Sequence, residues 1–122
     1  MPFWVMKNVK CPEMTPRPGY SLRGKVAVIT GGNRGIGYAC AEALAQEGCN
    51  IVIGAKTVES KALTQETIYM ARDLLIKNHG VRVLAVKTDV RSDLDLENLV
   101  KATIEEFGQI DILINNAAAL IP

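Results

Sequence analysis

Thr30-Gly31-Gly32-Asn33-Arg34-Gly35-Ile36-Gly37 is the stretch of this 122-residue sequence that decides its fold. It follows the apolar run at residues 26–29 and precedes residues 35–47, where apolar side chains recur at helical spacing until Gly48. The glycines allow a sharp turn between a strand and a helix, and the first N–H groups of such a helix have no partners within it. These N–H groups and the helix dipole favour an anion, so the stretch predicts a phosphate-binding turn.

The rest of the chain repeats this alternation of apolar runs and helical segments. The further apolar runs are at residues 51–53, 81–86 and 110–114. They lack apolar and polar alternation, which is typical of parallel strands covered by helices on both faces. A second helix is predicted over residues 60–78, with Gly80 as its terminator, and a third runs from the N-cap Ser92 to Gly108. Because parallel strands need crossover connections, this order predicts an α/β fold with an open parallel sheet. In the order 3-2-1-4 the four strands would be one half of a Rossmann-type fold with its fourth strand, that is, a Rossmann-type sheet truncated after the fourth strand.

The length and the composition fit one domain preceded by a leader. Hydrophobic residues make up 48% of the chain and charged residues 22%, which is too apolar for an intrinsically disordered protein. Residues 1–23 contain four of the five prolines, which lack a backbone donor and disfavour helix. We therefore expect a flexible N-terminal leader over residues 1–23 and a partial dinucleotide-binding domain over residues 24–122.

Charge and cysteine usage limit the partners and the compartment. A net charge of +1 gives no field for wrapping nucleic acid or coating an anionic membrane. No apolar stretch approaches the roughly 20 residues that span a bilayer. The three cysteines have the spacing of neither a disulfide framework nor a metal site. We expect an intracellular protein with no nucleic-acid partner, no metal and no membrane span. The cytoplasm is favoured, with the peroxisome and the mitochondrion as alternatives.

Three short motifs resemble those of a known family. Residues 30–37, TGGNRGIG, resemble the TGxxxGIG cofactor loop of the short-chain dehydrogenase/reductase family. Asn115-Asn116-Ala117-Ala118 resembles its NNAG motif, with Ala118 in place of glycine. Asp89-Val90 resembles the Asp-Val pair that holds the adenine. The resemblance covers residues 22–122 and implies the N-terminal, cofactor-binding half of an NAD(P)-dependent oxidoreductase.

Part of the sequence is similar to particular branches of the family. Residues 50–57 and 66–69 are similar to the hydroxysteroid dehydrogenase-like branch, and the peroxisomal enoyl-CoA reductases are the alternative. Neither similarity identifies a substrate.

The resemblance implies a set of cofactor-binding residues. In the glycine-rich turn they are Gly31, Asn33, Arg34, Gly35, Ile36 and Gly37, of which the glycines and Ile36 surround the pyrophosphate. Asp89 accepts the adenine amino hydrogen beside the backbone of Val90, and Asn116 and Ala117 line the ribose. For Asn115, cofactor binding and bracing of the sheet by side-chain hydrogen bonds both stay open.

The choice of cofactor follows from charge at the end of the second strand. An acidic side chain there accepts the ribose hydroxyls of NAD and repels the 2′-phosphate of NADP. In this chain the strand ends Gly54-Ala55-Lys56, so the acid is absent. Lys56 and Arg34 are predicted to clamp a 2′-phosphate, which favours NADP over NAD. The alternative is that both are solvated surface bases.

The catalytic residues that the family implies are not found in this sequence. The family uses a serine and a Tyr-x-x-x-Lys motif, in which the tyrosine transfers the proton of the substrate oxygen. Four residues after Tyr20, Tyr38 and Tyr69 stand Gly24, Glu42 and Asp73. We therefore assign no catalytic residue, and whether the chain itself is an enzyme stays open.

Two functions are compatible with these residues. The first is an NADP(H)-dependent short-chain oxidoreductase, represented by its cofactor-binding half, which transfers hydride to or from a small-molecule carbonyl or alcohol. The second is a non-catalytic nucleotide-binding or subunit-interaction module. A fourth strand left as an unpaired edge predicts a homo-oligomer in either case. His79, beside a predicted helix end, is expected to be solvent-exposed and not a general base.

Overall fold

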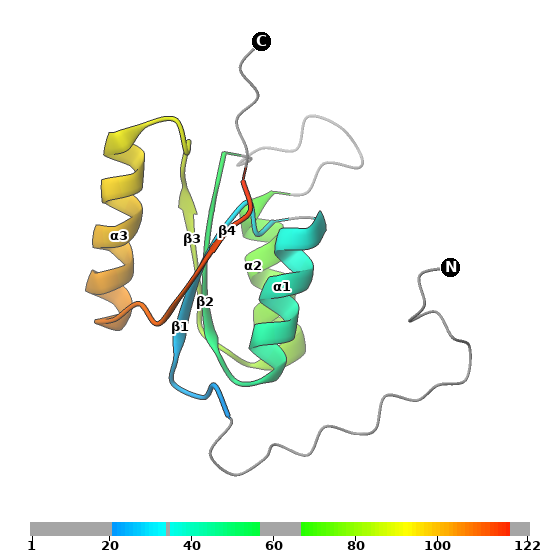
Figure 1. The fold of residues 1–122 in the computed structure, drawn as a ribbon. Coiled ribbons are helices and arrows are strands. Elements are labelled where there is room, and N and C mark those ends of the chain that lie inside the picture. The colour runs from blue at the N-terminus through cyan, green and yellow to red at the C-terminus, as the bar shows by residue number, and fades with distance from the viewer. Residues whose placement is uncertain (1–20, 34, 57–66, 118–122) are drawn as a thin grey trace.

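The computed structural model describes residues 21–33, 35–56 and 67–117. These residues form one sheet with helices on both faces (Figure 1). The strands are β1 (Val26–Thr30), β2 (Asn50–Ala55), β3 (Val83–Lys87) and β4 (Ile112–Asn115). The helices are α1 (Gly35–Gln46), α2 (Ile68–His79) and α3 (Asp93–Phe107). No helix in the described ranges is long and apolar enough to cross a membrane.

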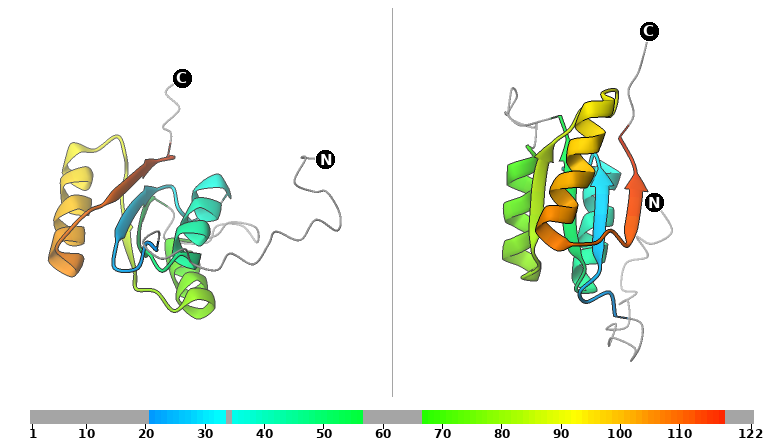
Figure 2. Two further views of the ribbon diagram at one scale, coloured as in Figure 1. Left: turned by 60° about the horizontal axis from the view of Figure 1, so that its bottom comes forward. Right: turned by 90° about the vertical axis from the view of Figure 1, so that its left-hand side faces the viewer.

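The sheet has the topology that the sequence predicts. All neighbouring strands are parallel and lie in the order β3-β2-β1-β4. In the central register Val28 lies opposite Val52 of β2 and Leu113 of β4. The chain leaves β1 toward β2 and β3 on one side and returns to β4 on the other. In doing so it passes through α3, which lies on the face of the sheet opposite to α1 and α2 (Figure 2). Such a reversal of strand order marks the place where open α/β sheets bind ligands, beyond the carboxyl ends of the strands.

β1 and β2 are buried on both faces, which is why their sequences do not alternate. The core on the side of α1 and α2 includes Ile29, Ile51, Ile53, Ile68 and Leu75. The core on the side of α3 consists of Val26, Val28, Val52 and Leu99. β4 does alternate, because Ile112 and Ile114 pack against the first core whereas Leu113 is 60% exposed. The edge position of β4 therefore leaves one of its faces uncovered.

The helix ends agree with the sequence at three points. The hydroxyl of Ser92 accepts a hydrogen bond from the backbone N–H of Asp95 (3.2 Å) and caps α3. Gly80 and Gly108 end α2 and α3 in the left-handed conformation, in which glycine meets no steric penalty. These features confirm the predicted stop and start signals.

The predicted start of the second helix at residue 60 is wrong. Thr67 is extended and its hydroxyl accepts a hydrogen bond from the N–H of Met70 (3.1 Å), so α2 begins at Ile68. Threonine caps a helix in this way because its hydroxyl oxygen accepts a hydrogen bond from one of the first N–H groups, which have no partner within the helix. Residues 57–66 lie outside the described residues, as does the predicted leader up to residue 20.

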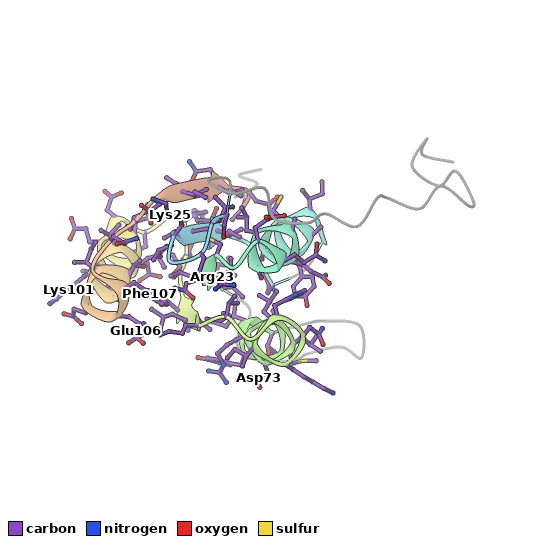
Figure 3. All side chains as sticks on the ribbon, turned by 90° about the horizontal axis from the view of Figure 1, so that it is seen from below. Arg23, Lys25, Asp73, Lys101, Glu106 and Phe107 are labelled. Carbon is purple, nitrogen blue, oxygen red and sulfur yellow. The ribbon has the colours of Figure 1, made fainter. Side chains whose placement is uncertain are left out.

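The third and fourth strands also begin later than predicted. The N–H of Arg82 donates to the side chain of Asn50 (3.1 Å), so the helix-to-strand turn extends to that residue and β3 begins at Val83. Arg82 also holds the end of α3, with its Nη2 2.7 Å from Glu106 Oε1 and its guanidinium carbon 4.7 Å from the centre of the Phe107 ring. Glu106 and Phe107 lie at the edge where the strands begin, which Figure 3 views end-on. β4 begins at Ile112.

Asp111 joins the beginnings of β1 and β4. Its Oδ2 accepts hydrogen bonds from the N–H of Val26 (2.8 Å) and from Nε2 of Gln109 (2.7 Å). Its own N–H donates to the carbonyl of Val26 (2.9 Å). The hydrogen bond from Val26, followed by that from Gln109, lowers the pKa of the Asp111 carboxyl group.

Replacing Asp111 with asparagine is expected to reduce stability at neutral pH and to weaken the loss of stability in acid. A carboxyl group whose pKa is lower in the folded than in the unfolded chain stabilises the fold above its unfolded pKa of about 4. This stabilisation disappears as the pH falls through the folded-state pKa. Urea denaturation at pH 7 and at pH 3 checks this, with Asp73→Asn on the outer side of α2 as the control (Figure 3). An equal difference between Asp111→Asn and the unmodified chain at both pH values contradicts the prediction.

Candidate cofactor site

The glycine-rich turn after β1 is packed on one side and open on the other. The N–H of Gly31 donates to the carbonyl of Gly54 (2.8 Å), which ties the turn to β2. A Cβ on Gly37 would overlap the carbonyl oxygen of Gly31 and stand 2.6 Å from Nδ2 of Asn116. By contrast, apart from its chain neighbours and its own helix backbone, no atom of the described residues lies within 4 Å of a Cβ built on Gly35, and Ile36 is 77% exposed. The open side at the start of α1 is therefore the side available to an anion.

Two further residues of the turn were predicted to bind the cofactor. Asn33 is buried, with 4% of its surface exposed, so it belongs to the inner side of the turn. Arg34 lies outside the described residues.

A buried hydroxyl joins the end of β4 to the turn. Oγ1 of Thr30 accepts hydrogen bonds from the N–H groups of Asn116 (3.0 Å) and Ala117 (3.1 Å) and donates to the carbonyl of Ile114 (3.4 Å). The side chain of Asn116 donates to the carbonyl of Gly31 (3.2 Å). The motifs at residues 30–37 and 115–117 therefore meet at the carboxyl ends of β1 and β4.

Asn116, not Asn115, makes the described bracing contact between these two motifs. Asn115 pairs with Thr30 in the register of the sheet, and it is exposed. Its neighbour Asn116 follows the last residue of β4, where its backbone N–H is held by Thr30 and its side chain reaches the turn. The described side-chain contacts therefore give no support to bracing of the sheet by Asn115.

The ends of β2 and β3 place a base beside an acid. The N–H of Thr88 donates to the carbonyl of Ala55 (2.9 Å), so the residues that follow, Lys56 and Asp89, leave the sheet side by side. Lys56 is exposed. The backbone N–H of Asp89 donates to Oδ2 of Asp95 (2.8 Å), which fixes this turn to the first turn of α3.

Arg91 grips the carboxylate of Asp89 through three hydrogen bonds. Oδ1 accepts from the backbone N–H (3.0 Å) and Nε (3.1 Å) of Arg91, and Oδ2 accepts from its Nη2 (2.9 Å). The hydrogen bonds from Arg91, with a smaller contribution from the charge of Lys56, lower the pKa of Asp89 to about 2. Asp89 is therefore an anion at neutral pH.

No role was predicted from the sequence for two of the residues that shape this edge. Thr30 acts through partners 86 and 87 positions away, so no local signal could show its role. Arg91 stands two residues after Asp89, a spacing at which an aspartate readily bonds the following backbone N–H, so it could have been found.

The single histidine lies at the opposite edge, and the expectation that it is solvent-exposed is wrong. The side chain of His79 is 12% exposed and its Nε2 lies 3.6 Å from Oε1 of Glu42. It is partly buried because it lies at the end of α2 against Glu42 of the neighbouring helix α1.

Comparison with known proteins confirms the resemblance. Residues 25–122 match the family model for short chain dehydrogenases, and the chain belongs to this family. The chain is 43% identical over 107 residues to hydroxysteroid dehydrogenase-like protein 2 of Bos taurus, which covers 88% of this chain and 25% of that protein.

Solved structures of the family share this fold. A short chain dehydrogenase of Mycobacterium thermoresistibile superimposes with a TM-score of 0.76 at 40% identity, over 83% of this chain and 36% of that one. The L-sorbose reductase of Gluconobacter frateurii, crystallised with NADPH and L-sorbose, gives a TM-score of 0.73 at 40% identity, over 81% of this chain and 35% of that one. The chain thus spans about a third or less of the length of these relatives.

Proposed function

We propose that this chain is the cofactor-binding half of an NADP(H)-dependent short-chain oxidoreductase. The observation that carries the proposal is the meeting of three motifs at one end of the parallel sheet: the glycine-rich turn, Asp89-Val90 and Asn116-Ala117. The bound cofactor supplies hydride chemistry between its nicotinamide and a carbonyl or alcohol carbon. The residues of this chain bind and orient the other parts of that molecule.

The open side of the turn fits a pyrophosphate. A bulky anion needs exposed N–H donors and space, and both are present where Gly35 and Ile36 begin α1. Gly31 and Gly37 act by a different route, because their lack of side chains keeps the turn closed against Asn116. We assign the ribose side to Asn116 and Ala117, which border the same turn.

The adenine is assigned to the turn after β3. A carboxylate can accept four hydrogen bonds, and Asp89 uses three of them for Arg91. The remaining position on Oδ2 suits one N–H of the adenine amino group. The backbone of Val90 stands next to it in the same turn.

NADP is proposed over NAD because the end of β2 carries a base instead of an acid. Lys56 is exposed beside the proposed adenine position, and Arg34 belongs to the glycine-rich turn. The NADPH complex of L-sorbose reductase supports this preference by analogy.

A reducing compartment is supported by Cys40 and Cys49, which are both free thiols. The exposed face of β4 at Leu113 supports self-association as a homo-oligomer.

Calorimetric titration with two adenine nucleotides tests the cofactor assignment. 2′,5′-ADP and 5′-AMP differ by one 2′-phosphate, and we expect the chain to bind the first more tightly. Lys56→Ala is expected to weaken 2′,5′-ADP about tenfold, the scale of one charge-assisted hydrogen bond, and to leave 5′-AMP nearly unchanged. Lys101→Ala on α3 is the control. Equal affinity for the two nucleotides would refute the NADP preference, and no binding of either would refute the cofactor site.

A further inference from the structure

Arg91 and Lys56 form a group of two cations around one carboxylate at the ends of β2 and β3. Lys56 and Asp89 follow neighbouring strands at the same edge of the sheet, where the N–H of Thr88 donates to the carbonyl of Ala55 (2.9 Å). The charge of Lys56 makes a small contribution to the lowered pKa of Asp89, after the larger contribution of the hydrogen bonds from Arg91. Without a partner, the negative charge of Asp89 would offset the positive charge of Lys56 and would repel any anion that Lys56 holds.

The backbone of Asp89 is held at this position on both sides. Its backbone N–H is held by Asp95 (2.8 Å), and its carbonyl accepts a hydrogen bond from the N–H of Ser92 (2.9 Å). Ser92 in turn caps α3, so the turn is anchored at both ends. A fixed negative charge beside a phosphate position has to be compensated by a neighbouring group.

Arg91 provides that compensation with a geometry that lysine or glutamine cannot copy. Nε and Nη2 contact the two carboxylate oxygens separately (3.1 and 2.9 Å), which is the bidentate arrangement typical of arginine. The grip leaves one acceptor position on Oδ2 for a ligand, so neutralisation does not abolish hydrogen bonding by Asp89.

We propose that Arg91 is a specificity-determining residue for the 2′-phosphate, acting through Asp89 without contacting the phosphate itself. By neutralising Asp89 it leaves the positive charge of Lys56 unopposed, so that an adenine nucleotide with a 2′-phosphate is preferred over one without. The inference rests on the proposed function, and it adds a residue that works through its effect on the carboxylate.

The test measures the ratio of the affinities for 2′,5′-ADP and 5′-AMP by calorimetry on the full chain. Arg91→Gln is expected to lower this ratio about tenfold, because a unit negative charge then opposes Lys56 at close range. The double variant Arg91→Gln with Asp89→Asn removes both charges, and the ratio is expected to return to within about twofold of the original, since their effects cancel. Arg72→Gln removes an equivalent arginine, paired with Asp73 at 3.0 Å on α2, and serves as the matched control.

Each outcome separates the proposal from its alternatives. An unchanged ratio in Arg91→Gln overturns it, and so does a double variant whose ratio stays low, which would mean that Arg91 contacts the phosphate directly. A chain that binds neither nucleotide overturns the proposed function together with this inference. A preference for 2′,5′-ADP that Arg91→Gln leaves intact keeps the proposed function and overturns the inference alone. Thermal unfolding followed by circular dichroism verifies that each variant is folded.

Discussion

Replacing Gly37 with alanine is expected to destabilise the chain by about 3 kcal/mol, near the upper end of the usual cost of overpacking. Helix propensity predicts the opposite sign, because alanine in a helix is more favourable than glycine by about 0.5–1 kcal/mol. The steric effect dominates because the new methyl group would overlap the carbonyl oxygen of Gly31 and crowd Asn116. Neither group can yield without loss of a hydrogen bond that closes the turn.

Urea denaturation and 2′,5′-ADP titration check this prediction together. The matched variant is Gly80→Ala, at a position with φ of 68° and no atom within 4 Å of the added Cβ. It is expected to cost about 1 kcal/mol through the left-handed backbone alone and to leave nucleotide binding intact. Gly37→Ala should weaken binding as well as stability. A Gly37→Ala variant as stable as the unmodified chain would show that the turn can open to admit a side chain.

Replacing Thr30 with valine is expected to destabilise the chain by about 2 kcal/mol, since it leaves backbone donors without an acceptor. Valine has nearly the shape of threonine, so packing around this residue, which is 4% exposed, is preserved. The N–H groups of Asn116 and Ala117 lose the hydroxyl oxygen that accepts from both. Nucleotide binding should weaken too, because these donors hold the end of β4 against the turn.

Thr103→Val distinguishes loss of this double acceptor from loss of any buried hydroxyl. The Thr103 hydroxyl is fully buried and only donates, to the carbonyl of Leu99 (2.7 Å), among the described contacts. Its removal is expected to cost about 1 kcal/mol or less, the usual value of one hydrogen bond. Equal losses in the two valine variants, measured by urea denaturation, would contradict the role given to Thr30.

The strands could be predicted from the sequence because each depends on a local signal, and the resemblance to the family supports their order. Continuous apolar runs indicate strands buried on both faces, and the right-handed crossover rule restricts how they can be arranged. The start of α2 could not be predicted in the same way. Apolar residues at helical spacing continue before Thr67, and only its extended backbone shows where the helix begins.

The candidate site was predictable in its parts and not in its connections. The glycine-rich turn, Asp89 and Asn116 stand in recognisable motifs. The contact of Asn116 with Gly31 and that of Arg91 with Asp89 depend on which side of the chain each side chain takes. Sequence spacing indicates that residues share an edge of the sheet, whereas the partner of each polar atom is set by packing.

The pairing of β1 with β4 has a consequence for the order in which the protein folds during synthesis. β1 can pair with β2 once residue 55 has emerged from the ribosome, because α1 is the sole connection between them. The bond between Val26 and Asp111 joins residues 85 positions apart, and the contacts of Thr30 require residues 116 and 117. Domains fold as their segments become available, and contacts distant in sequence form late. The proposed nucleotide site is therefore complete only when the fourth strand arrives, so nucleotide binding by a nascent chain would report that the four-stranded sheet has formed.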